Sequence, residues 1–454
     1  MRIAIASPHG CVLSWVKRLH DEGNNVLFHI GDDSTPGNVV SSKRVGRDIV
    51  PRTESYQHLI SWAKEGVAKG EPTMVFYGSS HLGKQADESR KSGLYVVGGG
   101  SICDKMEFDR PFGKELAEEA GILIPPYKTF SRLSDTIKHA EEQGKNLPEV
   151  YFKTDSYIKD DCTKKCKDSK SLIAYVKSLL DQDVPDATKN ELEECIDGVA
   201  VSTERWWNGR AWVGPFFGLI ERKKFMTDEV GPSTGCSMNA VWTYADTPMT
   251  AEALHWEELA VVFTKHKVPA GLYDINAILK DGEAYFLEFC ARLGYDSEPT
   301  GQMLYNELGR WLWFVATGQG DGGGFRDGIA VSLHLSVPPY PTQDAFGPHF
   351  KHSPLGAHIN GKNLGDLHSG PFIGYEVMAE DGQLMVGGPD GDVGLAACVG
   401  ESLADCAEQN YEFAKDGIDC AGVQFRSDAG KAILEDAEKA LEQGFSDLPE
   451  ELYN

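Results

Sequence analysis

The chain has 454 residues, too many for one hydrophobic core, and its length predicts roughly two to four domains. Its formal net charge at pH 7 is -25, which argues against binding to duplex nucleic acid or to an anionic membrane, because both need a basic surface. Ten cysteines lack the spacing of a disulfide framework, and no apolar run approaches the ~20 residues of a membrane span. The N-terminus begins directly with a strand pattern rather than a signal peptide, so we expect a cytoplasmic protein with reduced thiols.

The N-terminal part of the chain alternates predicted strands with predicted helices. Apolar runs indicate strands at 2–6, 26–30, 73–77 and 94–97, and helical periodicity indicates helices at 11–21 and 56–69. This alternation predicts a parallel sheet with ligands at the carboxyl ends of its strands. The first turn lacks the G-x-G-x-x-G pattern, which argues against a dinucleotide domain. We therefore expect a Rossmann-like domain over residues 1–108.

A core of mixed helices and strands is predicted over residues 109–325. Asp109 can cap a helix that has Pro111 in its first turn. Further elements are a short strand at 150–153, a helix at 169–180, a strand at 191–202 and helices at 250–265 and 303–317. The tryptophans that follow the strand at 191–202 are expected to pack inside a sheet.

Two strands around a tight turn are predicted between residues 271 and 298. Asp281-Gly282 at the tip is a strong hairpin signal. Period-two alternation places Asp274 and Asn276 on one face of the first strand, and Glu288 on the second strand can approach that face. Oxygen ligands on adjacent strands suit Mg²⁺, with phosphate oxygens and water in the remaining positions. An ordinary hairpin with solvated charges is the alternative, since acids at strand ends are common.

The glycine-rich stretch GQGDGGG at 318–324 predicts a domain boundary. Beyond it, strands are predicted at 328–337 and 374–385, and an amphipathic helix at 401–414. These elements predict a small C-terminal α+β domain over residues 326–454.

The hairpin and the residues after it resemble the metal-binding end of an ATP-grasp ligase. The order Gly-x-Tyr, strand, Asp-Gly turn, strand, Glu-Phe-x-x-Arg-x-Gly is most similar to the phosphoribosylamine–glycine ligase family. The family pattern Glu-Phe-Asn-x-Arg-Phe-Gly-Asp-Pro-Glu reads here EFCARLGYDSE, so Cys290 replaces the Asn that ligates metal, and Cys prefers softer metals. The resemblance implies Mg²⁺ (or Mn²⁺) held by Glu288 with Asp274 or Asn276. The predicted fold is thus an α/β and α+β protein with an ATP-grasp core.

The resemblance also implies a site for the phosphates of ATP. Arg110 stands where the family has its nucleotide-phosphate Lys, and Arg can bind phosphate bidentately. Lys153 ends the short strand, in the position of a family lysine that reaches an ATP phosphate. The family covers the phosphates with a glycine-rich loop, whereas the loop at 154–165 contains no glycine.

Adenine and ribose contacts are implied at the hinge strand. The family has Glu-Glu-Phe-Leu-Asp-Gly there, and the residues whose backbone faces the base correspond to Glu194, Cys195 and Ile196. The family's acids after that glycine are replaced by Val199 and Ala200, which makes Glu204 the candidate for the ribose contact.

A third site is implied for an acyl phosphate. Lys223 and its basic neighbours precede Gly231-Pro232-Ser233-Thr234-Gly235, where the family has Thr-Gly-Pro-Asn-Thr-Gly-Gly-Met. Consecutive amides and two hydroxyls suit an anion, and basic groups beside them stabilise its tetrahedral adduct. Together with Arg292, the residues implied in catalysis are Lys223, Ser233, Thr234 and Gly235.

The turns that hold phosphoribosylamine in the family differ here. The family's Gly-Gly-Arg-Glu-His turn reads Pro8-His9-Gly10-Cys11-Val12, and its Gly-Pro-Glu-Ala-Pro-Leu turn reads Tyr77-Gly78-Ser79-Ser80-His81-Leu82. Because loops after strands carry specificity on a fixed scaffold, the changed turns indicate a different amine acceptor.

The resemblance implies ATP-dependent joining of a carboxylate to an amine through an acyl phosphate. Three hypotheses follow: a ligase that joins glycine or another amino acid to a non-standard amine, the standard phosphoribosylamine–glycine ligase of purine biosynthesis, or a nucleotide-binding scaffold without turnover. The expected partners are small molecules, a nucleobase-linked amine among them, and the expected assembly is a monomer or a homodimer.

Overall fold

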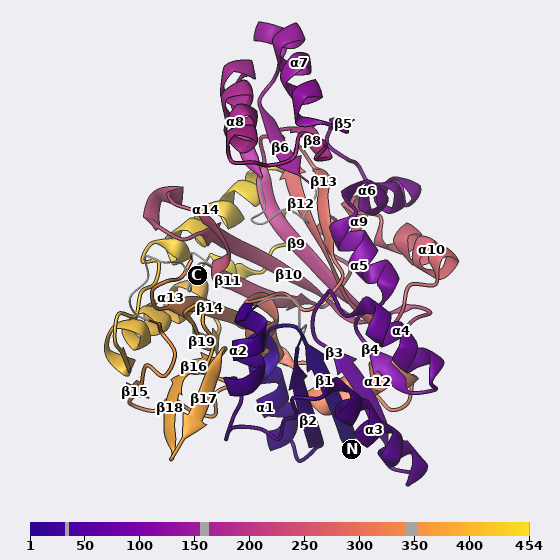
Figure 1. Cartoon of the computed structure of the whole chain (residues 1–454), viewed down its shortest axis with the longest axis vertical. Helices are drawn as coiled ribbons and strands as arrows, with labels where there is room; N and C mark the ends of the chain where they lie inside the picture. The colour runs from indigo at the N-terminus through magenta and orange to yellow at the C-terminus, as the bar shows by residue number, and fades with distance from the viewer. Residues whose placement is uncertain (32–35, 155–162, 342–352, 454) are drawn as a thin grey trace.

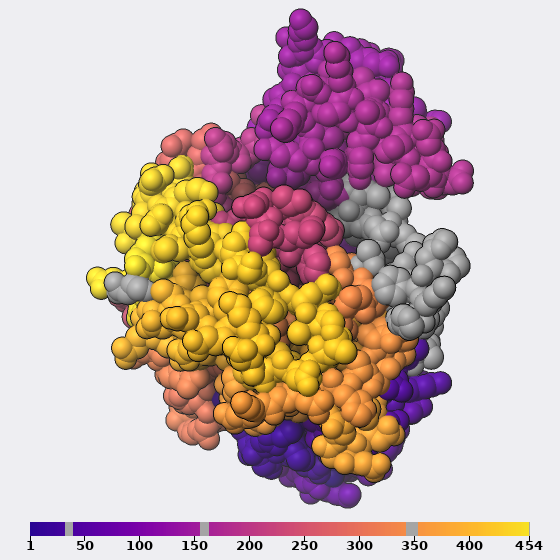
Figure 2. Space-filling model, turned by 90° about the vertical axis from the view of Figure 1, so that its left-hand side faces the viewer, coloured from indigo at the N-terminus to yellow at the C-terminus, as the bar shows by residue number. Residues whose placement is uncertain are grey.

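The computed structural model describes residues 1–31, 36–154, 163–341 and 353–453. Figure 1 shows a large sheet through the middle of the molecule, with the N-terminal strands below it, a small lobe above it and the C-terminal elements beside it. Figure 2 shows the small lobe projecting from the rest of the molecule. Within the described residues, no helix is long and apolar enough to cross a membrane.

The N-terminal residues form the predicted parallel sheet, in the order β2-β1-β3-β4. Its strands are β1 (Arg2–Ser7), β2 (Asn25–Ile30), β3 (Thr73–Tyr77) and β4 (Tyr95–Val97). Its helices are α1 (Leu13–Asp21), α2 (Pro36–Arg44), α3 (Tyr56–Ala68), α4 (Gly83–Lys91) and α5 (Ser101–Phe108). The Rossmann-like prediction is confirmed, although the sequence analysis did not predict α2, α4 and α5.

The small lobe follows α6 (Arg110–Glu119), whose first turn is capped as predicted, with Asp109 accepting from the amide of Phe112. Its antiparallel sheet has the order β5-β8-β6-β7. The strands are β5 (Tyr127–Phe130), β6 (Val150–Thr154), β7 (Lys164–Cys166) and β8 (Asn190–Glu194). Helices α7 (Leu133–Gln143) and α8 (Ser169–Asp181) pack on the apolar face, where Phe152 and Leu192 are buried. The charged side chains of β6 and β8 alternate with these residues and lie on the other face.

The large sheet has eight strands in the order β13-β12-β9-β10-β11-β14-β19-β16. Its core strands are β9 (Val199–Trp207), β10 (Trp212–Lys224), β11 (Ser233–Tyr244), β12 (Gly271–Lys280) and β13 (Glu283–Cys290). The strand predicted at 191–202 is two strands, because β8 ends at Glu194 in the small sheet and β9 begins at Val199 in the large one. Trp206 and Trp207 are fully buried in β9, which confirms the packing role predicted for them.

Helices cover the large sheet and differ from the prediction at their breaks. The helix predicted at 250–265 is divided into α9 (Met249–Ala253) and α10 (Trp256–His266), because His255 between them has φ of 49°. The helix predicted at 303–317 begins later, as α12 (Leu308–Thr317), and the short α11 (Ser297–Gly301) was not predicted.

The C-terminal residues continue the large sheet through β14 (Ile329–Ser336), β19 (Asp392–Gly400) and β16 (Phe372–Gly374). The predicted boundary after residue 325 therefore crosses one sheet, and the division into 1–108, 109–325 and 326–454 stays a prediction. The strand predicted at 374–385 is instead a hairpin of β17 (Val377–Glu380) and β18 (Gln383–Val386), turned at Asp381-Gly382. The other elements are β15 (Ile359–Gly361), β20 (Ile418–Cys420), α13 (Leu403–Glu412) and α14 (Ala429–Glu442).

Candidate functional site

A polar patch lies on one face of the large sheet where β13, β12 and β9 adjoin. Residues directly opposite each other in an antiparallel pair share a face. Asn276 of β12 is paired with Glu288 of β13 on one side and with Ser202 of β9 on the other. Asp274, two residues earlier, is paired with Cys290 and Glu204. The alternation predicted from the sequence therefore brings the three metal candidates Asp274, Asn276 and Glu288 to one face.

The metal candidates differ in whether their side-chain oxygens already accept hydrogen bonds within the chain. Asp274 is 7% exposed, and its Oδ1 has no hydrogen-bond partner among the described residues. Asn276 accepts from the hydroxyl of Ser202 and donates its Nδ2 to the Sγ of Cys290 at 3.3 Å. An orphaned buried carboxylate oxygen fits a cation, whereas the amide of Asn276 already has partners within the chain.

Phosphate oxygens would have to complete any metal site here. Within the described residues, no three His, Cys, Asp or Glu side chains are arranged to hold a metal ion by themselves. Mg²⁺ is commonly bound through one or two carboxylates together with substrate phosphates, so two carboxylates suffice for a nucleotide-dependent site. Glu288 and the free oxygen of Asp274 therefore fit a Mg²⁺ that arrives with a nucleotide.

A narrow cavity of about 10 Å³, enough for about one water molecule, lies between the phosphate candidates and Glu288. It is lined by Met106, Glu107, Arg110, Gly113, Lys114, Lys153, Glu191 and the segment 286–289. Burial would raise the pKa of Glu288, but Lys223, Arg110 and Lys153 lower it below its ordinary value, so the carboxylate is ionised at neutral pH. The arrangement places positive charge and a metal-ligating carboxylate around one space, as phosphate binding requires.

Lys153 belongs to a buried chain of charges that the sequence analysis did not predict. Its Nζ donates to Glu193, whose other oxygen lies 2.8 Å from the Nζ of Lys114. Lys114 also donates to Glu191 at 2.7 Å, and all four side chains are at most 9% exposed. The available signal was the spacing Glu191-Leu192-Glu193 in a strand, which places two acids on one face. Their lysine partners could not be identified without the fold.

The hinge residues lie in the connection between the small and the large sheet. The amide of Glu194 donates to the carbonyl of Pro126 at 2.9 Å, and that of Cys195 to the carbonyl of Glu149 at 3.0 Å. These two amides are therefore used within the chain, while Ile196 follows them and is partly exposed. Their contacts with a base stay a prediction.

Glu204, the ribose candidate, is buried instead against a second carboxyl. It is 1% exposed, and burial together with Glu298 and Asp274 raises its pKa well above the ordinary value. Glu298 on α11 is equally buried, and burial raises its pKa to about 7. The structure thus places Glu204 beside the metal candidates, and its role toward ribose stays a prediction.

Arg292 follows β13 and lies beside the cavity. Its Nε donates to Glu107 at 3.1 Å, and its guanidinium lies 4.7 Å from the ring centre of Tyr295. Burial would lower the pKa of Arg292, but Glu107 and Cys290 raise it well above its ordinary value. The side chain is therefore a fixed cation at the end of the strand that carries Glu288.

The predicted acyl-phosphate turn is partly strand. Ser233, Thr234 and Gly235 begin β11, with Ser233 paired with Lys224 of β10, so the turn itself spans residues 225–232. The hydroxyl of Thr234 donates to the carbonyl of Lys223 at 2.9 Å. Burial would lower the pKa of Lys223, but Glu221 and Glu288 raise it, which holds the ammonium protonated. Lys223 and Glu288 thus favour each other's charged form, and the catalytic role of Lys223 stays a prediction.

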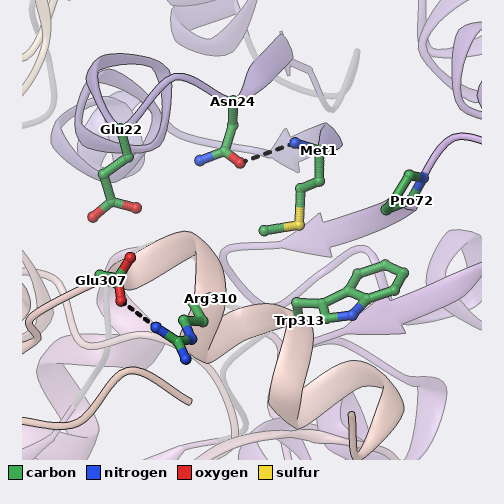
Figure 3. A pocket seen from close by; sticks show the side chains of 7 residues that line it. All are labelled: Met1, Glu22, Asn24, Pro72, Glu307, Arg310 and Trp313. Carbon is green, nitrogen blue, oxygen red and sulfur yellow. Dashed lines mark hydrogen bonds and ion pairs between the residues drawn. The ribbon is translucent and has the colours of Figure 1, made fainter. Parts of the chain in front are cut away.

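A larger crevice lies away from this site. It measures about 550 Å³ and is lined by Met1, Glu22, Asn24, Pro72, Glu307, Arg310 and Trp313, none of them a predicted site residue (Figure 3). Its polar groups serve contacts within the chain, since Glu22 accepts from the amides of Leu308 and Gly309, and Glu307 pairs with Arg310. We assign this crevice to the packing of α12 against the N-terminal sheet.

Comparisons with known proteins find relatives that match most of the chain. No family model matches the chain. It is 25% identical over 367 residues to phosphoribosylamine–glycine ligase from Leptospira interrogans, a match that covers 77% of this chain and 80% of that protein. Among solved structures, phosphoribosylamine–glycine ligase from Thermotoga maritima superposes with a TM-score of 0.68 at 18% identity, covering 94% of this chain and 100% of that one.

A second solved structure extends the comparison. Biotin carboxylase from Campylobacter jejuni, described as a complex with β,γ-ATP, superposes with a TM-score of 0.63 at 13% identity, covering 97% of this chain and 96% of that one. The comparisons confirm the predicted ATP-grasp fold and the resemblance to phosphoribosylamine–glycine ligase. They also confirm the predicted class of enzyme, an ATP-grasp ligase, at the level that these relatives share.

Proposed function

We propose that this ATP-grasp protein is an ATP-dependent carboxylate–amine ligase that forms an amide through an acyl phosphate. One observation carries the proposal: Arg110, Lys153 and Glu288 line the same cavity, with Arg292 and the unpartnered oxygen of Asp274 beside it. Cations for phosphates, carboxylates for a metal and a further cation for a second anion are the groups that such a reaction needs.

The residues of the chain act mainly by positioning and by neutralising charge. Arg110 and Lys153 hold the phosphates of ATP, while Glu288 and Asp274 hold Mg²⁺ (or Mn²⁺), which supplies charge neutralisation between the phosphates when bound. Arg292 and Lys223 hold the substrate carboxylate in line with the γ-phosphorus. A carboxylate oxygen attacks that phosphorus and ADP leaves; the amine then attacks the acyl carbon, and inorganic phosphate leaves.

Glycine or another amino acid is the proposed carboxylate, and a non-standard amine, which includes a nucleobase-linked amine, is the proposed acceptor. The standard purine-pathway reaction is a second candidate, favoured by the match to phosphoribosylamine–glycine ligase over 77% of the chain. A cytoplasmic location and a monomeric or homodimeric state remain predictions.

Trapping the acyl phosphate with hydroxylamine tests the proposed ligase reaction even though the natural amine is not identified. Hydroxylamine converts an acyl phosphate into a hydroxamate, so ATP, Mg²⁺, hydroxylamine and glycine or another amino acid should yield hydroxamate and ADP in equal amounts. Glu288→Gln should lower the rate at least ~100-fold, because it removes a carboxylate ligand of the Mg²⁺ that would neutralise the reacting phosphates. Glu283→Gln, an exposed glutamate of the same strand, should leave the rate unchanged.

The outcomes separate the three hypotheses. Two results together would support the purine-pathway reaction. Phosphoribosylamine would suppress hydroxamate formation, and ADP release without hydroxylamine would need both glycine and phosphoribosylamine. Hydroxamate formation without that response would support a ligase for another amine. Absence of hydroxamate with any amino acid, while calorimetry still detects ATP binding, would overturn the ligase and leave a nucleotide-binding scaffold.

A further inference from the structure

The turn that follows β1 lies near Tyr295 and Arg292. The ring of His9 lies 6.3 Å from the ring of Tyr295, and the thiol of Cys11 lies within the electrostatic field of Arg292. The indole of Trp15 donates to the carbonyl of Glu298 at 3.0 Å, which fixes the start of α1 against α11. These contacts place the turn after β1 beside Arg292, the side chain that is proposed to hold the acyl phosphate.

The Gly10 amide in this turn already donates a hydrogen bond to a carboxyl group of the chain, that of Glu376. The amide of Gly10 donates to Oε1 of Glu376 at 3.3 Å, and the hydroxyl of Ser41 on α2 donates to the same oxygen at 3.4 Å. Glu376 directly precedes β17 and is 7% exposed. Amides at the start of a helix after a parallel strand commonly bind the anionic group of a ligand. Here that position is filled from within the chain.

The surrounding backbone is shaped around the Glu376 side chain. A Cβ on Gly388 would lie 1.5 Å from Oε2 of Glu376, and a Cβ on Gly10 would lie 3.0 Å from Oε1. The amides of Gly387 and Gly388 donate to the carbonyl of Glu376 at 2.7 and 3.1 Å. Two glycines thus give room to the carboxyl group while the backbone beside it holds the residue in place.

Further carboxylates surround this position and oppose another anion. Burial, Asp392 and Asp390 raise the pKa of Glu376 to about 8, and burial with Asp392 raises that of Asp390 to about 6. Burial is the larger cause of both shifts, and Asp392 adds negative charge beside both groups. His334 lies beside Asp392, and its two ring nitrogens are bonded to Asp296 and Asp392 at 3.0 and 3.1 Å. The Gly10 amide and the His334 imidazole are therefore already bonded to carboxyl groups of the chain.

We propose that Glu376 is a specificity-determining residue that excludes amine acceptors carrying a phosphate group, which directs the enzyme to neutral or cationic amines. This inference rests on the proposed ligase reaction. Its physical basis is occupancy of the Gly10 amide together with the negative potential of Asp390 and Asp392. It predicts that phosphoribosylamine is rejected because of its phosphate.

The test compares acceptors that differ by one phosphate. Hydroxamate formation is measured with ethanolamine, O-phosphoethanolamine and phosphoribosylamine as competitors of hydroxylamine. In the wild-type protein the phosphorylated amines should not suppress hydroxamate. In Glu376→Ala, which vacates the Gly10 amide, they should suppress it at concentrations at least ~10-fold lower than any effect on the wild type. Glu376→Gln, which still fills the space, should behave like the wild type.

Glu380→Gln is the matched control, because Glu380 lies on the same hairpin and pairs with Arg47 at the surface. Suppression by phosphorylated amines in the wild-type protein would overturn the proposal, and so would a Glu376→Ala variant that gains no response to them. If Glu376→Ala does not fold, Glu376→Ser takes its place. Failure of the wild-type protein to form any hydroxamate would instead overturn the ligase reaction itself, before any amine is added.

Discussion

The Nζ of Lys114 lies 2.8 Å from the carboxylate of Glu193, which also accepts from Lys153. With Glu191 on the other side of Lys114, the four side chains alternate in charge, and all are buried beside the narrow cavity that Lys114, Lys153 and Glu191 line. Removal of one partner from a buried ion pair leaves a charge without compensation, which costs far more than the loss of an exposed pair. The stability of the small lobe should therefore depend on each member of this chain of charges.

Glu193→Gln should lower the free energy of unfolding by about 3 kcal/mol, because two buried ammonium groups then share one carboxylate. ATP should recover part of this loss, since Lys153 is proposed to bind its phosphates beside the cavity that Lys114 also lines. Thermal unfolding with and without Mg²⁺-ATP measures both effects, and ATP should raise the melting temperature more in the variant than in the wild type. Glu142→Gln, which removes an exposed pair with Lys138, should cost less than about 0.5 kcal/mol. Equal ATP shifts in Glu193→Gln and the wild type would contradict this account.

Cys290→Asn should strengthen Mg²⁺ binding. Cys290 is paired with Asp274 across β12 and β13, and its Sγ accepts from Asn276. An amide oxygen in this place adds a hard ligand beside Asp274 and Glu288, whereas sulfur prefers softer ions. The Mg²⁺ concentration that gives half-maximal hydroxamate formation should fall about 10-fold. Cys290→Ala removes the sulfur without adding oxygen and should not reproduce the effect; an unchanged Mg²⁺ requirement in Cys290→Asn would exclude position 290 from the metal site.

The sequence predicted best the parts of the fold that have a local signal. Alternation with an Asp-Gly turn identified β12 and β13, and the capping residue Asp109 identified the start of α6. The same Asp-Gly signal at 381–382 marks the turn between β17 and β18, which the prediction for 374–385 joins into one strand. The segment that forms α4, GKQADESRK, is polar throughout, so it has no apolar stripe to indicate a helix.

The site was predictable only where its residues lie close together in the sequence. Asp274 and Glu288 belong to one hairpin, so their spacing indicates a shared face. His334 and Asp296 are 38 positions apart, and Glu376 and Gly10 are 366 apart. Contacts of this kind depend on the order of strands in the sheet and on how α11 and β17 pack on it. Neither periodicity nor turn chemistry contains that information.

Glu298→Gln should stabilise the protein at alkaline pH and not at acidic pH. Burial raises the pKa of Glu298 from 4.5 to about 7, so the folded protein binds this proton more tightly than the unfolded chain does. Stability from this group is complete below pH 4.5 and is lost as the pH rises through 7. At pH 8 the variant should exceed the wild type by about 3 kcal/mol in free energy of unfolding, and near pH 4.5 the two should coincide.

Denaturant unfolding at a series of pH values measures this difference. Glu283→Gln changes an exposed carboxyl of the same charge and should follow the wild type throughout. A Glu298→Gln variant that is less stable than the wild type at pH 8 would show that the ionised carboxylate has a stabilising partner, contrary to its burial beside Glu204.

His334 should carry a positive charge well above neutral pH. Burial would lower its pKa, but Asp296 and Asp392, bonded to its two ring nitrogens, raise it to about 10. Because the pKa is raised, the stabilisation from His334 is complete below pH 6.5 and is lost as the pH rises through 10, with a total of about 5 kcal/mol. His334→Gln should therefore destabilise the protein strongly at pH 7 and only slightly at pH 10.5, whereas His20→Gln, at an exposed position, should do neither. The NMR chemical shifts of the His334 ring carbons measure this titration directly. A midpoint near pH 6.5 would show that Asp296 and Asp392 do not hold the proton. The pH dependence of stability would then have to come from other groups.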